Sequence, residues 1–166
     1  HVVIVYYTYM TLPRFEYSRE ALTARGEEAM SAMATMPFGC TVRFATKANP
    51  HPEIISIFSR AGIAFDASSS YEATELLAMG MAGDTISLSS QQTAHNLDEL
   101  LSAGVRYVAT SLHQLELYRA SPVHPQTVGL RVNPGIGSGH NNRTTTGGRN
   151  SSFGLWHSYV PDALAL

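Results

Sequence analysis

The stretch Val42-Arg43-Phe44-Ala45-Thr46-Lys47-Ala48-Asn49-Pro50 decides which fold the sequence predicts. Larger apolar side chains fall on alternate positions from Val42, which is typical of a short strand. Asn49-Pro50 forbids its continuation, so Lys47 falls at the carboxyl end of that strand. Burial there would favour the neutral, nucleophilic amine that forms an imine with an aldehyde cofactor. A strand that ends at the surface would instead leave Lys47 in water, and these residues alone favour neither outcome.

Strand-like apolar runs recur from this point, each about 20–22 residues after the last, at 42–47, 63–67, 85–89, 105–109 and 127–132. Helical patterns separate them, and a further helix is predicted over about 19–33. Local signals mark where these helices begin. Pro52 and Pro161 are prolines at the start of a helical pattern, and Ser69-x-x-Glu72 and Ser111-x-x-Gln114 are capping boxes. Leucine periodicity from Leu97 marks the remaining helix. Strands alternating with short helices predict parallel βαβ units with right-handed crossovers.

The predicted fold class is α/β, of the (β/α)8 barrel type, present as an incomplete barrel of about five βα units. A doubly wound sheet is the alternative, but no G-x-G-x-x-G follows the first strand. A complete barrel needs about 250 residues, so this chain of 166 is expected to be the front part of a larger enzyme. We expect residues 1–39 to form a lead-in strand and helix, and residues 40–166 the N-terminal part of the barrel domain.

Composition narrows the classes of function. A mean hydropathy of -0.05 and an early apolar run of only residues 2–7 argue against a membrane protein. A net charge of -2 with scattered basic residues argues against nucleic-acid binding. The single cysteine, Cys40, favours a reducing, cytoplasmic compartment. His51, His95 and His113 lack the spacing of metal ligands, so no metal is expected.

In a barrel, chemistry gathers where the strands end. The predicted strand ends carry Lys47, Asp66, Arg131 and several hydroxyl side chains. Asp66 can pair with Lys47 or with Arg131, or it can be a solvated strand end. Glu72 has a simple structural role open to it, because in a capping box its side chain bonds the backbone at Ser69. The glycine-rich segment 135–148 is either a surface loop or a backbone that approaches an anionic substrate.

These residues resemble a known family. The segments 42–50 and 65–72 (FDASSSYE) are similar to the alanine-racemase-like barrel of pyridoxal-phosphate decarboxylases. Within that group, residues 130–135 (LRVNPG), the glycine-rich segment with His140, and residues 150–156 (NSSFGLW) resemble diaminopimelate decarboxylase. The resemblance covers residues 40–166, and its blocks occur in the family's order and approximate spacing.

The resemblance implies a pyridoxal 5'-phosphate cofactor bound covalently by Lys47, with Asp66 and Arg131 supporting the cofactor site. It places Glu72, His140 and Ser151 at the substrate. Ser152 departs from the family, which commonly has a lysine at this position. The implied reaction is decarboxylation of meso-diaminopimelate to L-lysine and carbon dioxide, in a homodimer whose remaining catalytic residues and C-terminal β domain lie further along the chain.

Two alternatives remain open from the sequence. One is a decarboxylase of the same fold for ornithine, lysine, arginine or a carboxyalkyl polyamine. The other is a non-catalytic homologue that regulates a true decarboxylase. Because the implied active site needs residues from beyond Leu166, residues 1–166 alone are expected to be inactive.

Overall fold

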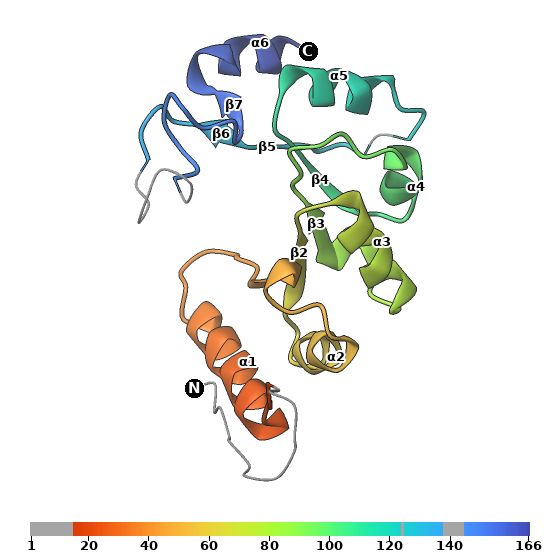
Figure 1. The fold of residues 1–166 in the computed structure, drawn as a ribbon, viewed down its shortest axis with the longest axis vertical. Coiled ribbons are helices and arrows are strands. Elements are labelled where there is room, and N and C mark those ends of the chain that lie inside the picture. Colours follow the sequence, from red (N-terminus) through yellow and green to blue (C-terminus); the bar gives the residue numbers. More distant parts are fainter. Residues whose placement is uncertain (1–14, 124, 138–144) are drawn as a thin grey trace, which may run out of the picture. The chain divides into compact units, whose positions relative to one another are not determined.

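The computed structural model describes residues 15–123, 125–137 and 145–166 (Figure 1). These residues fall into two compact units. The first comprises residues 15–44 and 49–64, and the second comprises residues 45–48 together with the described residues from 65 onward. None of the helices described is long and apolar enough to span a membrane.

Two helices dominate the first unit, α1 (Arg19–Ala34) and α2 (Pro52–Arg60). The α1 helix begins where sequence predicts, because the Ser18 hydroxyl accepts a hydrogen bond from the Ala21 backbone at 3.1 Å. Gly26 lies where α1 meets α2, and a Cβ built there would be 3.0 Å from the Ala61 Cβ. A Cβ at this position would require Ala61 to shift by a few tenths of an ångström, so glycine favours the close approach of the two helices.

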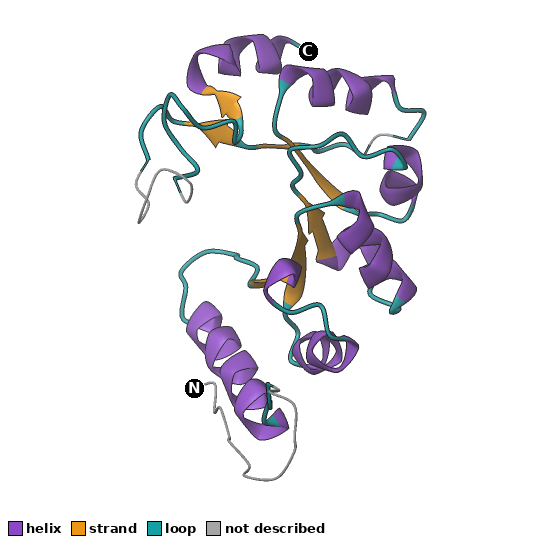
Figure 2. Cartoon of the chain, in the orientation of Figure 1, coloured by secondary structure: helices purple, strands orange, loops and turns teal. Residues whose placement is uncertain are grey.

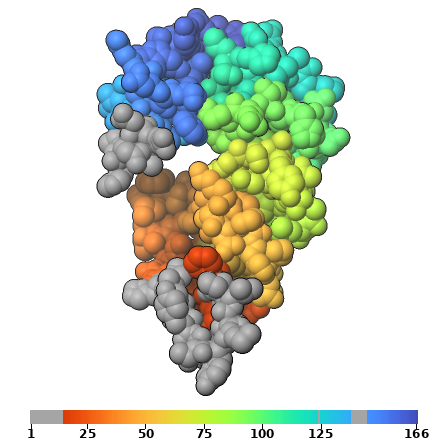
Figure 3. Space-filling model, viewed as in Figure 1, coloured from red at the N-terminus to blue at the C-terminus, as the bar shows by residue number. Residues whose placement is uncertain are grey.

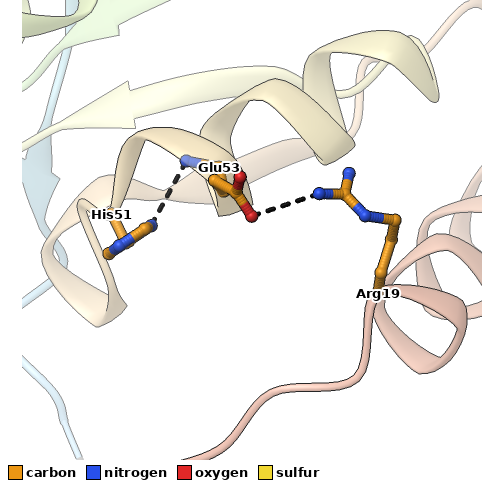
Figure 4. Close-up of polar contacts among 3 residues, drawn as sticks. All are labelled: Arg19, His51 and Glu53. Carbon is orange, nitrogen blue, oxygen red and sulfur yellow. Dashed lines mark hydrogen bonds and ion pairs between the residues drawn. The ribbon is translucent and has the colours of Figure 1, made fainter.

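The amino end of α2 is held by polar contacts (Figure 4). His51 caps the helix, since its Nδ1 accepts a hydrogen bond from the Glu53 backbone N–H at 3.3 Å. The Glu53 carboxylate is 3.1 Å from a guanidinium nitrogen of Arg19, the first residue of α1. Both side chains of this ion pair are more than half exposed, so its contribution to stability is small.

The first strand is shorter than the sequence predicts. β1 spans Arg43–Ala45 rather than 42–47, and a 3-10 turn, η1 (Thr46–Ala48), follows it directly. The predicted strand end at Lys47 is thus a residue of that turn. The chain passes from the first unit into the second within β1.

The second unit contains the parallel sheet (Figures 1 and 2). Neighbouring strands follow chain order, with Asp66 opposite Ser87, Leu88 opposite Tyr107 and Val108 opposite Gly129. The sheet has five strands, and β1 is followed by β2 (Ala64–Ala67), β3 (Ile86–Leu88), β4 (Arg106–Ala109) and β5 (Gly129–Leu130). Three helices lie along one side of this sheet: α3 (Ser70–Ala78), α4 (Leu97–Ser102) and α5 (Leu112–Ala120). A turn, η2 (Gly83–Thr85), precedes β3.

The two faces of the sheet differ in polarity, because successive side chains of a strand point to opposite faces. The helix side carries the fully buried core, from strands and helices together: Phe65, Ala67, Ala73, Leu76, Ile86, Leu88, Leu100, Val105 and Ala109. The intervening positions Asp66, Ser87 and Val108 face the other way. Two of these three are polar, which distinguishes this face from an ordinary hydrophobic one.

The last part of the second unit contains β7 (Leu155–Trp156), a strand that the sequence did not predict. Arg131 separates β5 from β6 (Val132–Asn133), and β6 pairs in parallel with β7 (Leu155–Trp156). Two residues are too few to give a periodic pattern. A turn, η3 (His157–Tyr159), leads into α6 (Val160–Ala165), which confirms the helix predicted near Pro161 and lies beside α5 (Figure 3).

Candidate active site

A cavity of about 420 Å³ lies on the polar face of the second unit. The residues that line it come from the strands and from the loops that follow them: Lys47, Asp66, Ser68, Ser87, Ser89, Gln91, Val108, Arg131 and Phe153. The volume is within the range of small-molecule sites. Parallel strands that share an edge explain how residues far apart in sequence meet in one cavity.

Three residues proposed from the sequence line this cavity together: Lys47, Asp66 and Arg131. Lys47 and Arg131 are the two cationic side chains of the lining, and Asp66 is the carboxylate. Asp66 and Arg131 are half-buried, whereas Lys47 is exposed. Of the two outcomes that the sequence left open for Lys47, the described residues show the exposed one, with Lys47 in the η1 turn that follows β1.

Arg131 is fixed through its backbone on both sides. Its N–H donates to the Ala109 carbonyl of β4 at 2.9 Å, and its carbonyl accepts from the Leu155 N–H of β7 at 2.7 Å. Its guanidinium carbon lies 4.8 Å from the centroid of the Phe153 ring, within range of a cation–π contact. The cationic group is thus held at the cavity by two strands and one aromatic ring.

Glu72 makes a different contact from the one that the capping box predicts. Its carboxylate accepts from the Ser68 N–H at 2.7 Å, one residue before the expected Ser69. The Ser69 hydroxyl accepts from the Glu72 N–H at 3.1 Å, as a capping serine should. Glu72 does not line the cavity, but Ser68 does. The Glu72 carboxylate therefore contacts the cavity only indirectly, through its hydrogen bond to the backbone of Ser68.

Gln114 holds the next two loops in the same way, and sequence reasoning gave it only a capping role. Its side chain is 2% exposed and its amide oxygen accepts from the Thr110 N–H at 2.8 Å. Its amide nitrogen donates to the Ser90 carbonyl at 3.0 Å, which the Thr110 hydroxyl also reaches at 3.1 Å. Ser90 lies between Ser89 and Gln91, both of which line the cavity.

Asn133 joins the two described ends of the glycine-rich segment. Its side-chain oxygen accepts from the N–H groups of Gly135 at 3.1 Å and Gly148 at 2.9 Å. Its nitrogen donates to the carbonyls of Gly148 and Ser151 at 3.1 and 3.3 Å. The Ser151 hydroxyl accepts from the Phe153 N–H at 3.2 Å. His140, the other substrate residue suggested by the resemblance, lies outside the described residues.

Four lining residues were not singled out from the sequence: Ser87, Gln91, Val108 and Phe153. Ser87 and Val108 alternate with buried residues of predicted strands, so strict alternation would have found them. Gln91 and Phe153 lie in loops, where no periodic pattern exists. Within the described ranges, no group of three His, Cys, Asp or Glu side chains is placed to bind a metal ion.

Fold and cavity together define an α/β protein of the barrel type, with an amine, a carboxylate and a guanidinium at the strand ends. The model of the pyridoxal-dependent decarboxylase family, pyridoxal binding domain, matches residues 22–166. The chain therefore belongs to this family, and it contains part of an alanine-racemase-like barrel, as predicted. The predicted pyridoxal 5'-phosphate cofactor is confirmed for the family.

Individual relatives agree with this assignment. The chain is 36% identical to the diaminopimelate decarboxylase of Streptomyces coelicolor over 75% of its own length and 29% of that protein. It is also 36% identical to that of Escherichia coli (strain K12), over 74% of this chain and 30% of the relative. A crystal structure of diaminopimelate decarboxylase matches with a TM-score of 0.71 at 31% identity, covering 87% of this chain and 34% of that one.

The chain thus spans about 30% of the length of these curated relatives. The residues present fit the family's cofactor on chemical grounds. A primary amine reacts with an aldehyde, and a guanidinium complements a phosphate or carboxylate. Lys47 and Arg131 supply these two groups within one cavity.

Proposed function

We propose that the protein containing this chain is a pyridoxal-phosphate-dependent decarboxylase that converts meso-diaminopimelate to L-lysine and carbon dioxide. The observation that carries this proposal is that Lys47, Asp66 and Arg131 line one cavity at the strand ends. The substrate follows from the relatives, which are diaminopimelate decarboxylases. Lysine biosynthesis is the corresponding metabolic role.

The bound cofactor supplies the electron sink that accepts the electron pair left by departing carbon dioxide. Lys47 would supply the primary amine that holds the cofactor through its aldehyde. Asp66 and Arg131 place one negative and one positive charge at the same cavity, which orients ionised groups of cofactor and substrate. Ser68, Ser87 and Ser89 add hydroxyl donors to the wall.

Glu72, His140 and Ser151 complete the proposal as substrate-binding residues. Glu72 supports the cavity through Ser68, and Ser151 supports it through Phe153. We further propose that residues 40–166 are the N-terminal part of a barrel domain and residues 1–39 its lead-in. The whole protein acts as a cytoplasmic homodimer, and residues 1–166 by themselves are inactive.

The decisive experiment uses the fact that Lys47 is the only lysine among residues 1–166, so an adduct on a peptide from this part of the protein identifies Lys47. The full-length protein is loaded with pyridoxal 5'-phosphate, reduced with borohydride and digested, and the peptides are weighed. We expect the phosphopyridoxyl adduct on the peptide that contains Lys47. Lys47→Ala removes that adduct together with the visible absorbance of the bound cofactor, while Arg43→Ala, four residues away, retains both.

The substrate is tested by release of carbon dioxide. Meso-diaminopimelate is offered to the loaded protein beside ornithine, lysine and arginine. The proposal requires that meso-diaminopimelate has the highest kcat/KM. An adduct on Lys47 with preference for another amino acid would retain the fold and cofactor but reject the substrate. Absence of any adduct would reject the enzyme altogether.

A further inference from the structure

The Arg131 side chain is less constrained than its backbone. Strand hydrogen bonds fix the backbone on both sides, to Ala109 and to Leu155. Among residues 15–123, 125–137 and 145–166, the guanidinium contacts no carboxylate or carbonyl acceptor, and its recorded partner is the ring of Phe153. A long, flexible cationic side chain at a cavity needs such a partner to remain in one position.

Phe153 lies in a segment whose backbone runs against Arg131. The Phe153 N–H donates to the Ser151 hydroxyl at 3.2 Å. Gly154 follows with a φ of +82°, and a Cβ there would be 2.8 Å from the Arg131 carbonyl oxygen. The Leu155 N–H then donates a hydrogen bond to the Arg131 carbonyl at 2.7 Å. The sequence Phe153-Gly154-Leu155 thus runs directly along Arg131, and only glycine permits so close an approach.

We propose that Phe153 is a positioning residue for Arg131. Its ring keeps the guanidinium at the cavity wall, so the positive charge meets an anionic oxygen group of a bound ligand without first losing side-chain entropy. The anionic group is a phosphate or a carboxylate, from cofactor or from amino-acid substrate. This inference rests on the proposed function for the identity of the ligand, but the contact between Phe153 and Arg131 does not.

The test varies the electron density of the ring while its size stays nearly constant. Phe153 is replaced in the full-length protein by mono-, di- and trifluorophenylalanine, and by Phe153→Leu. One arm measures the dissociation constant of pyridoxal 5'-phosphate, and the other that of meso-diaminopimelate for the loaded protein. We expect at least one of the two dissociation constants to rise stepwise with each added fluorine. Phe153→Leu should raise it by about two- to fivefold.

A double-mutant cycle separates positioning from ordinary packing. In the Arg131→Met background the fluorine series is expected to have no effect, because the cation is absent. Phe58 is the matched control ring, since its aromatic partner is Phe44 at 4.7 Å rather than a cation. Fluorination at Phe58 is expected to leave both dissociation constants unchanged.

The possible results are distinguishable. Equal affinities across the Phe153 series in both arms, or the same losses in the Arg131→Met background, would overturn the inference and leave the proposed function intact. Absence of the Lys47 adduct would reject the proposed function instead. In that case the cycle is repeated on the denaturant midpoint of the cofactor-free protein, where lack of coupling between Phe153 and Arg131 overturns the inference.

Discussion

The side-chain nitrogen of Gln114 donates a hydrogen bond to the carbonyl oxygen of Ser90, 3.0 Å away. This bond joins the first turn of α5 to the loop after β3. The buried Gln114 side chain therefore connects the loop after β3 to the loop after β4. It bonds Ser90, whose neighbours Ser89 and Gln91 line the cavity. Glu72 does the same for the loop after β2 through Ser68. The helix caps of this unit thus also determine the shape of the cavity.

Gln114→Glu tests this arrangement with almost no change in size. The variant keeps an acceptor for the Thr110 N–H but replaces the donor to Ser90 with an oxygen, in a buried position. We expect it to lower the free energy of unfolding by about 2–3 kcal/mol, measured by denaturant titration of the full-length protein. Gln92→Glu is the control, because Gln92 is exposed. Equal stability of both variants would contradict the role of Gln114.

Glu72→Gln separates the cap from a contact with substrate. A glutamine oxygen can still accept from the Ser68 N–H, so the free energy of unfolding should change by less than about 1 kcal/mol, whereas Glu72→Ala loses about 1–2 kcal/mol. If Glu72 also binds substrate through its charge, Glu72→Gln raises the KM for meso-diaminopimelate. Steady-state kinetics check this, and an unchanged KM would leave Glu72 with the structural role alone.

Gly154→Ala is expected to lower the stability of the fold more than Gly80→Ala, although both glycines have a positive φ. Gly154 and Gly80 have nearly the same φ, +82° and +84°, but a Cβ at Gly80 has no neighbour within 4 Å. Gly80→Ala should therefore cost only the backbone term of about 1 kcal/mol. Gly154→Ala should cost about 2 kcal/mol more, because its Cβ meets the Arg131 carbonyl at 2.8 Å. Thermal midpoints compare the two, and equal losses would argue against the close approach.

Asn133 is expected to control the base of the glycine-rich segment. Asn133→Leu removes acceptors and donors together and leaves the Gly135 and Gly148 N–H groups unpaired. We expect a loss of about 3 kcal/mol and faster hydrogen exchange at both amides. Asn133→Asp keeps the acceptor, so those two amides should stay protected. Asn150→Leu is the exposed control. Unchanged exchange in Asn133→Leu would refute this assignment.

Alkaline pH should weaken the helix side of the sheet. Burial raises the pKa of Tyr107 to about 12, and burial also raises the pKa of Tyr118, which stacks on it at 6.0 Å. A folded-state pKa above the unfolded value of about 10 gives stability that is complete below pH 10. That stability is lost as the pH rises toward 12, by about 2 kcal/mol for Tyr107. Tyr107→Phe should reduce this slope in unfolding titrations, whereas Tyr71→Phe, at an exposed position, should not.

Local pattern was sufficient for most of the elements. The capping serines at positions 18, 69 and 111 and the proline at position 52 place the helix starts within about one residue of the observed ones. These signals act through neighbouring backbone groups, so they can be recognised from a few consecutive residues. β7 was missed because two residues carry no period, and η1 because a 3-10 turn has no distinct sequence signal there.

The sequence by itself determined the alternation of strands and helices, the position of Lys47, Asp66 and Arg131 in or shortly after strands, and the family resemblance. Those features depend on the order and spacing of residue types along the chain. Only the tertiary structure decided that Phe153 lies against Arg131, that Gln114 bonds Ser90, and that Lys47 is exposed. Each of these depends on contacts between segments about 20 residues apart or on burial, and a chain reveals them only once its strands have paired.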